Sequence, residues 1–149
     1  KPEIDTRNKK NIIKSHGKIE IEAETVSNAK EILDLSTDVD IVGIDEAQFF
    51  DESIVEVCNK LADSGKRVIV AGLDMDYMGK PFGPMPNLLA IAEYVTKVHA
   101  ICTRSGKMAS YTHRIAKSDE LILLGDTRKY EALSRKEFIK MKKKSNGKS

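Results

Sequence analysis

Apolar residues occur in short runs along the chain, and their spacing predicts alternating strands and helices. Residues 39–44 are nearly all apolar, which predicts a strand covered on both faces, as parallel sheets require. Residues 52–64 carry apolar side chains at helical spacing and end before Gly65, which is typical of an amphipathic helix with a glycine stop. Residues 67–73 predict a second buried strand. Together they predict a βαβ unit with parallel strands and a right-handed crossover.

The rest of the chain has weaker patterns. We expect a loop at 1–18, a strand at 19–23, a helix at 27–35 with Ser27 as N-cap, a helix at 87–94 and a strand at 95–101. Short β-like pieces follow at 108–115 and 120–124, and a basic helix starts at Ser134. This change of pattern predicts an α/β core at 1–101, a small β-rich domain at 102–137 and a basic tail at 138–149.

Composition and charge indicate a globular protein and bear on whether it binds nucleic acid or membranes. Of the 149 residues, 40% are hydrophobic and 32% are charged, as in an ordinary globular protein. Residues 135–149 hold seven basic residues against one acidic residue, which predicts a solvated tail rather than a nucleic-acid arm. Cys58 and Cys102 form no CxxC pair, so we expect a reducing cytoplasm. No run approaches the roughly 20 apolar residues of a membrane span, so neither membrane nor nucleic acid is an expected partner.

An acid pair, Asp45-Glu46, ends the first buried strand. Ligands bind beyond the carboxyl ends of strands in open α/β sheets. A hydrophobic strand that ends in Asp resembles the Walker B arrangement, in which the Asp holds Mg²⁺, and a neighbouring Glu can accept a proton from a substrate hydroxyl. The pair therefore predicts a nucleotide site of a P-loop-type phosphoryl-transfer enzyme. Asp45-Glu46-Ala47-Gln48 is also a DExQ box, which leaves a helicase or ATPase as an alternative.

The second strand leads into a loop with glycines and aromatic side chains. Gly72 and Gly83 suit close approach of the backbone, and Tyr77 and Phe82 offer flat apolar faces on which a nucleobase could stack. Taken alone, such aromatic residues are more often part of a core.

Several motifs follow one another along residues 1 to about 137: Lys1-Pro2-x-x-Asp5-x-Arg7, Ser15-His16-Gly17, Ile44-Asp45-Glu46-Ala-Gln48-Phe49-Phe50, Val70-Ala-Gly72-Leu73-Asp74, Lys80-Pro81-Phe82-Gly83, Val95-Thr-Lys-Val-His-Ala-Ile-Cys102, Ser110-Tyr111-Thr112-x-Arg114, Leu124-Gly125 and Lys129-Tyr130. In this order they resemble the thymidine kinase family of the cellular, tetrameric type. The resemblance implies a RecA-like, P-loop-type parallel sheet core with a small β-rich lasso domain.

The resemblance also implies roles for individual residues. Glu46 matches the general base for the thymidine 5′-hydroxyl, and Asp45 matches the acid that holds Mg²⁺ through water. Asp5 and Arg7 match a pair near the phosphates of ATP. The implied nucleoside-binding positions are Phe49, Leu73, Tyr77 and Phe82 around the thymine, and Thr112, Arg114, Gly125 and Tyr130 in the lasso. Thymidine and ATP as substrates, dTTP as feedback inhibitor and a homotetramer follow from the same resemblance.

Two departures from the family pattern alter these expectations. The glycine-rich phosphate loop lies upstream of the Lys1-Pro2 motif in the family, and Gly147-Lys148-Ser149 is only a coincidental fragment of such a loop. We therefore expect a missing or processed amino-terminal end, or a chain that is not an active kinase by itself. The family's zinc site uses two CxxC pairs, and the matching positions here are Cys102, Ser105, Ser134 and Glu137. One thiolate of four is a poor zinc site, so zinc is predicted to be absent.

His99 and His113 are at the wrong spacing from Cys102 to replace the lost ligands, so both are expected to be solvated surface residues. Three functions remain in order of preference: an ATP-dependent thymidine kinase, a catalytically inactive remnant that still binds nucleoside, and a RecA-like ATPase or helicase fragment.

Overall fold

The computed structural model describes residues 1–4, 12–14, 20–115 and 130–146. The chain forms two compact units. Unit 1 contains Lys1–Asp74 and Pro81–Glu93, and unit 2 contains Met75–Lys80 and Tyr94–Ser149. The boundaries predicted at 101 and 137 stay predictions. None of the helices in the described ranges has the length and apolarity of a membrane span.

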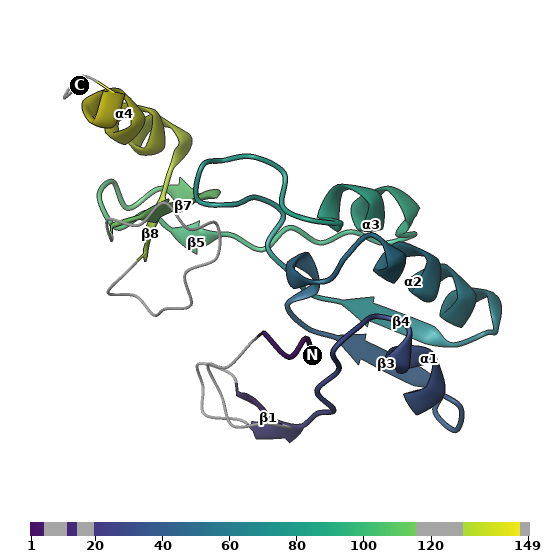
Figure 1. Cartoon of the computed structure of the whole chain (residues 1–149). Coiled ribbons are helices and arrows are strands. Elements are labelled where there is room, and N and C mark those ends of the chain that lie inside the picture. The colour runs from purple at the N-terminus through teal and green to yellow at the C-terminus, as the bar shows by residue number, and fades with distance from the viewer. Residues whose placement is uncertain (5–11, 15–19, 116–129, 147–149) are drawn as a thin grey trace. The chain divides into compact units, whose positions relative to one another are not determined.

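Unit 1 is built around a parallel pair of strands, β3 (Ile41–Ile44) and β4 (Arg67–Val70), joined through helix α2 (Ser53–Asp63) (Figure 1). The register pairs Ile41 with Arg67 and Ile44 with Val70. The predicted βαβ unit with parallel strands is thereby confirmed, and with it a mixed α/β fold. Its other helices are α1 (Glu31–Leu35), the short η1 (Ala47–Phe49) and α3 (Met85–Ile91).

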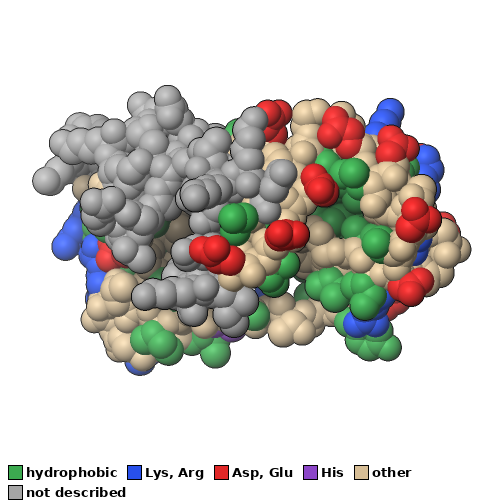
Figure 2. Space-filling model, turned by 90° about the horizontal axis from the view of Figure 1, so that it is seen from below, with side chains coloured by type: hydrophobic (Ala, Val, Ile, Leu, Met, Phe, Trp, Pro, Cys, Tyr) green, Lys and Arg blue, Asp and Glu red, His purple; other side chains and the backbone are tan. Residues whose placement is uncertain are grey.

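The core of unit 1 covers one face of β3. Val42 and Ile44 are buried with the apolar stripe of α2, which consists of Ile54, Val57, Cys58 and Leu61. The prediction that this strand is covered on both faces is wrong for the described residues, because burial alternates along β3 and Ile41 is 62% exposed. Ile69 on β4 is also exposed. Hydrophobic side chains lie exposed among Asp and Glu side chains on the face seen in Figure 2.

Two local predictions in unit 1 need correction. The expected loop at 1–18 contains strand β1 (Ile12–Lys14), which pairs antiparallel with β2 (Glu20–Glu22), and Pro2 forms a parallel bridge with Val26. Ser27 is not the N-cap of α1, because its hydroxyl donates to the Glu31 carboxylate at 2.5 Å. The N-cap position of α1 is Lys30, and the Asn28 side-chain oxygen accepts hydrogen bonds from the N–H groups of Lys30 and Glu31.

The described residues of unit 2 form two small antiparallel sheets and a helix. Strand β5 (Ala100–Ile101) pairs with β6 (Met108–Ala109), and β7 (Tyr111–Arg114) pairs with β8 (Tyr130–Leu133). Helix α4 (Arg135–Asn146) is the expected basic helix, and it buries Phe138 against Tyr111 with ring centroids 4.6 Å apart.

The strand expected at 95–101 is reduced to its last two residues. Strands need a hydrogen-bonding neighbour, and Ala100 and Ile101 pair with the two residues of β6. Val98 is accordingly 89% exposed. The strand expected at 120–124 lies outside the described residues.

Candidate functional site

The acid pair follows the carboxyl end of β3 in unit 1. Pairing with the second strand continues just beyond it, because the Ala71 N–H donates to the Ile44 carbonyl at 2.8 Å and the Ala47 N–H donates to the Ala71 carbonyl at 3.0 Å. Asp45 and Glu46 are therefore held at the edge of the sheet where ligands bind in open α/β folds.

The backbone of Glu46 is left-handed, with φ 55° and ψ 41°. It is the one non-glycine residue with positive φ in the described ranges. Such a conformation costs roughly 1–3 kcal/mol when surrounding structure enforces it. The Glu46 N–H donates to an Asp45 carboxylate oxygen at 3.0 Å, which supports this turn and leads the chain directly into η1.

Gln48 connects the acid pair to the end of the neighbouring strand. Its side chain is buried, and its Nε2 donates to Glu46 Oε2 at 2.7 Å. Its Oε1 accepts a hydrogen bond from the Leu73 N–H at 2.9 Å. Gln48 was not among the predicted site residues, although the DExQ box contained the signal that could have identified it.

Two glycines lie against Gln48, each where an added side chain would meet neighbouring atoms. A Cβ on Gly83 would lie 2.4 Å from the Gln48 carbonyl oxygen, and Gly83 has a left-handed φ of 49°. A Cβ on Gly72 would lie 2.8 Å from Gln48 Oε1 and 2.8 Å from Met85 Sδ. Larger residues at either position would displace Gln48.

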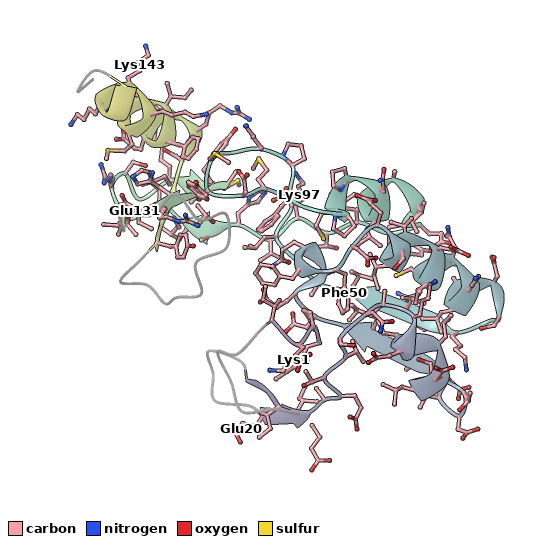
Figure 3. The ribbon with its side chains drawn as sticks, viewed as in Figure 1. Lys1, Glu20, Phe50, Lys97, Glu131 and Lys143 are labelled. Atoms are coloured by element: carbon pink, nitrogen blue, oxygen red, sulfur yellow. The ribbon has the colours of Figure 1, made fainter. Side chains whose placement is uncertain are left out.

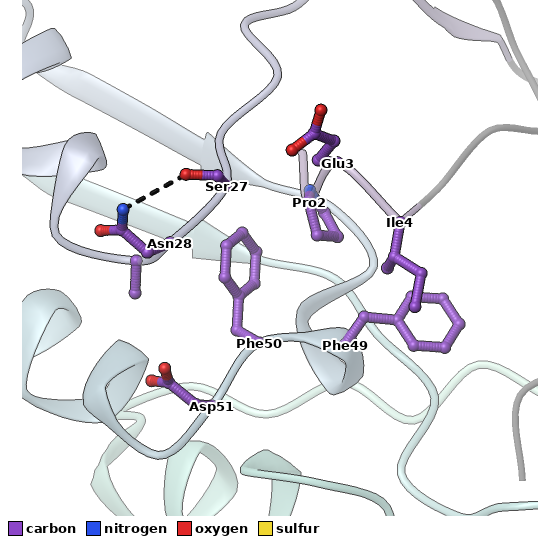
Figure 4. Close-up of a pocket in the computed structure, with 9 residues that line it drawn as sticks. Pro2, Glu3, Ile4, Ser27, Asn28, Phe49, Phe50 and Asp51 are labelled. Carbon is purple, nitrogen blue, oxygen red and sulfur yellow. Dashed lines mark hydrogen bonds between the residues drawn. The ribbon is translucent and has the colours of Figure 1, made fainter.

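Aromatic side chains flank the same turn. Phe49 and Phe82 are in edge-to-face contact, with ring centroids 5.7 Å apart. Phe49 and Phe50 also line a cavity of about 410 Å³ with Pro2, Ile4, Asn28 and Asp51 (Figure 4). Leu73 is 49% exposed. Unit 1 thus brings together five predicted site residues, which are Asp45, Glu46, Phe49, Leu73 and Phe82.

Unit 2 contains a second group of predicted site residues. The Arg114 guanidinium lies 3.7 Å from the centroid of the Tyr77 ring and donates from Nη2 to the Tyr130 hydroxyl at 3.0 Å. Thr112 and Arg114 are two residues apart on β7, so they lie on the same face of that strand. Asp5, Arg7 and Gly125 lie outside the described residues.

The positions that match zinc ligands in the family lie in unit 2, and hydrogen bonds join three of them, Cys102, Ser105 and Ser134. Cys102 is buried, and the Ser105 and Ser134 hydroxyls are 3.5 Å apart. Glu137 accepts a hydrogen bond from Lys140 at 2.7 Å. Within the described ranges, no three His, Cys, Asp or Glu side chains cluster closely enough to hold a metal. Absence of zinc stays a prediction.

The Cys102 sulfur accepts several hydrogen bonds. Burial acts to raise the pKa of the thiol, but hydrogen bonds from the Ser105 hydroxyl and from the N–H groups of Ser134, Arg104 and Ser105 outweigh burial and lower it to about 6. Arg104 also donates from Nε to Glu131 Oε2 at 3.0 Å. Glu131, labelled in Figure 3, lies on β8. The two histidines differ, because His99 is exposed whereas His113 is half-buried, which corrects the expectation for His113.

We expect Cys102 to make the stability of the protein pH-dependent. A thiol has a pKa of about 8.5 in an unfolded chain. The lower folded value means that the stabilisation is complete above about 8.5 and is lost as pH falls towards 6. The melting temperature of wild type should therefore increasingly exceed that of Cys102→Ser as pH rises from 6 to 8.5.

Cys58 is the matched control for this pH series. Burial raises the pKa of the Cys58 thiol to about 11, so its contribution does not grow between pH 6 and 8.5. The difference between wild type and Cys58→Ser should stay level over most of that range and shrink slightly near pH 8.5, where the unfolded thiol ionises. An equally level difference for Cys102→Ser would contradict the assigned thiolate.

Comparison with known proteins finds similarity to thymidine kinases. A family model described as thymidine kinase matches residues 1–138. A thymidine kinase from Bacteroides fragilis is 52% identical over 135 residues, which is 91% of this chain and 68% of the relative. A thymidine kinase from Bacteroides thetaiotaomicron is 49% identical over 140 residues, covering 94% and 70% of the two chains. One from Porphyromonas gingivalis is 53% identical over 135 residues, covering 91% and 66%.

Proposed function

Because this chain belongs to the thymidine kinase family, we propose that it transfers the γ-phosphoryl group of ATP to the 5′-hydroxyl of thymidine. The family relationship makes it a kinase. The observation that carries the specific proposal is the carboxylate of Glu46, which lies at the carboxyl end of β3 and receives a hydrogen bond from Gln48.

In the proposed reaction, the Glu46 carboxylate accepts the proton of the thymidine 5′-hydroxyl. The 5′-oxygen forms a bond to the γ-phosphorus, and the bond from that phosphorus to the β,γ-bridging oxygen breaks. The products are dTMP and ADP, and the proton remains on Glu46 until solvent removes it. Catalysis of this kind rests mainly on positioning and on charge stabilisation.

Asp45 is suited to bind Mg²⁺. It is a half-buried carboxylate at the strand end, and one of its oxygens already accepts the Glu46 N–H. Mg²⁺ prefers one or two carboxylates with waters and substrate phosphates to an all-protein cage, so a single carboxylate such as Asp45 can serve. When bound, Mg²⁺ would neutralise charge on the phosphates of ATP.

We assign nucleoside binding to residues in each unit. In unit 1 the apolar side chains of Phe49, Leu73 and Phe82 would contact the thymine. In unit 2 the proposed contacts are Tyr77, Thr112, Arg114, Gly125 and Tyr130. Asp5 and Arg7 are proposed to act near the phosphates. The edge-to-face pair of Phe49 and Phe82 supports a flat apolar wall.

The proposal is tested by incubating the purified full-length protein with thymidine and γ-labelled ATP. We expect labelled dTMP, and none when Mg²⁺ is chelated or ATP is replaced by a non-hydrolysable analogue. Thymidine binding without any phosphorylation would overturn the proposal in favour of an inactive remnant. ATP hydrolysis that depends on nucleic acid would favour the ATPase alternative.

The proposal extends to the fold of the core, the oligomeric state, the regulation and the location of the protein. We propose a RecA-like P-loop core, a homotetramer, feedback inhibition by dTTP and a cytoplasmic location.

A further inference from the structure

The side chain of Gln48 uses both ends of its amide. Its nitrogen donates to Glu46 Oε2 at 2.7 Å, and its oxygen accepts the Leu73 N–H at 2.9 Å. These bonds join the acid of the first strand end to the backbone just after the second. A buried amide requires partners for both ends, and here one partner is the carboxylate assigned as the base.

The surroundings leave Gln48 little freedom to adopt another conformation. Its residue is 2% exposed, its carbonyl is covered by Gly83, and its Oε1 lies against Gly72. The side chain of Met85 lies next to Gly72 on the same side. Such packing fixes the amide, and the amide in turn fixes the direction in which the Glu46 carboxylate points.

We propose that Gln48 is a positioning residue that holds the Glu46 carboxylate in its reactive orientation and couples it to the backbone at Leu73. This inference rests on the proposed function, because Glu46 must act as base for its orientation to affect turnover. Leu73 is also assigned to the thymine contacts, so a single side chain would link proton transfer to nucleoside placement.

Two substitutions of Gln48 distinguish its hydrogen bond to Glu46 from its hydrogen bond to the Leu73 N–H. Gln48→Glu keeps an acceptor for the Leu73 N–H but replaces the donor to Glu46 with a second carboxylate. Gln48→Leu removes both bonds at similar size. We expect both variants to lower kcat by up to about 10²-fold, because small displacements of a catalytic group have effects of that order. The Leu73 amide should exchange faster with solvent in Gln48→Leu alone.

The pH profile gives a second readout. Like charges close together favour the protonated form of a carboxyl group. The acidic limb of the kcat profile of Gln48→Glu should therefore move to higher pH, whereas that of Gln48→Leu should move much less. If Gln48 only supported the loop, Gln48→Glu would keep wild-type kcat and profile, and that result would overturn the inference.

The control is another amide–carboxylate pair in unit 1. Asn87 Nδ2 donates to Glu52 Oε2 at 2.8 Å at an exposed site, so Asn87→Leu should leave kcat and profile unchanged. An equal loss in Asn87→Leu would show a general effect on the fold and overturn the inference.

Failure of the inference and failure of the proposed function are distinguishable. If Glu46→Gln is inactive while Gln48→Glu behaves as wild type, the inference alone fails. If wild type does not phosphorylate thymidine, the proposed function fails. The hydrogen bond from Gln48 to Glu46 is then tested separately, by measuring how fast the Gln48 side-chain amide protons exchange with solvent. Faster exchange in Glu46→Ala would support the contact, and unchanged exchange would overturn it.

Discussion

Replacing Glu46 with Gln should lower kcat for thymidine phosphorylation by about 10²–10⁴-fold, the range in which a positioned general base contributes. The substitution keeps the size of the side chain and removes its capacity to accept a proton. In the wild-type protein the Gln48 Nε2 donates to Glu46 Oε2, and the substitution replaces that carboxylate with a second amide. The KM for thymidine should change far less than kcat. Steady-state kinetics of the full-length protein at saturating ATP provide the measurement.

A second glutamate in unit 1 serves as the control. Glu56 is an exposed helix residue paired with Lys60 at 2.6 Å, so Glu56→Gln should retain wild-type kinetics. If kcat of Glu46→Gln remains within a few-fold of wild type, Glu46 is not the base.

Replacing Ile54 with Ala should lower the free energy of unfolding by about 2–5 kcal/mol, as large-to-small changes in a packed core do. Ile54 is 0% exposed and lies in the cluster between α2 and β3. The substitution removes apolar contacts and leaves a space that the surrounding helices fill only in part. Urea denaturation followed by circular dichroism measures the change, with the m-value confirming that the same transition is compared.

The same substitution at an exposed site of unit 1 isolates the effect of burial. Ile91 ends α3 and is 38% exposed, so Ile91→Ala should lower the free energy of unfolding by less than about 1 kcal/mol. Equal losses in the two variants would mean that Ile54 is not a core residue in solution.

Hydrophobic periodicity predicted the elements in the central part of unit 1 because each carries its own apolar pattern. The apolar stripe of α2 follows from the spacing of its own residues, and the apolar run at 39–44 located strand β3. How far each face of β3 is covered depends on other elements, so the run alone gave the wrong burial for this strand. Strand β1 was missed because it is three residues long and lies in an otherwise polar stretch, so the hydrophobic pattern alone does not reveal its pairing with β2. The run at 95–101 had strand composition, but within the described part of the chain only its last two residues have a neighbouring strand.

The candidate site shows a similar limit. Asp45 and Glu46 could be identified because they follow a buried strand directly. Gln48 was overlooked because its role depends on the Leu73 N–H, which is 25 residues away in sequence. The role of Asn28 was missed for a local reason, since Ser27 and Asn28 can both accept hydrogen bonds from N–H groups at a helix start and only the geometry shows that Asn28 does so.

The left-handed backbone of Glu46 has an evolutionary consequence. Glycine adopts this conformation without the roughly 1–3 kcal/mol penalty of other residues, so folding alone would favour glycine at position 46. At position 46, selection for catalysis therefore favours glutamate, whereas selection for stability favours glycine. A descendant released from the need to phosphorylate its substrate would be expected to drift towards glycine here. Glycine at this position would then mark loss of the chemistry in a chain that still folds.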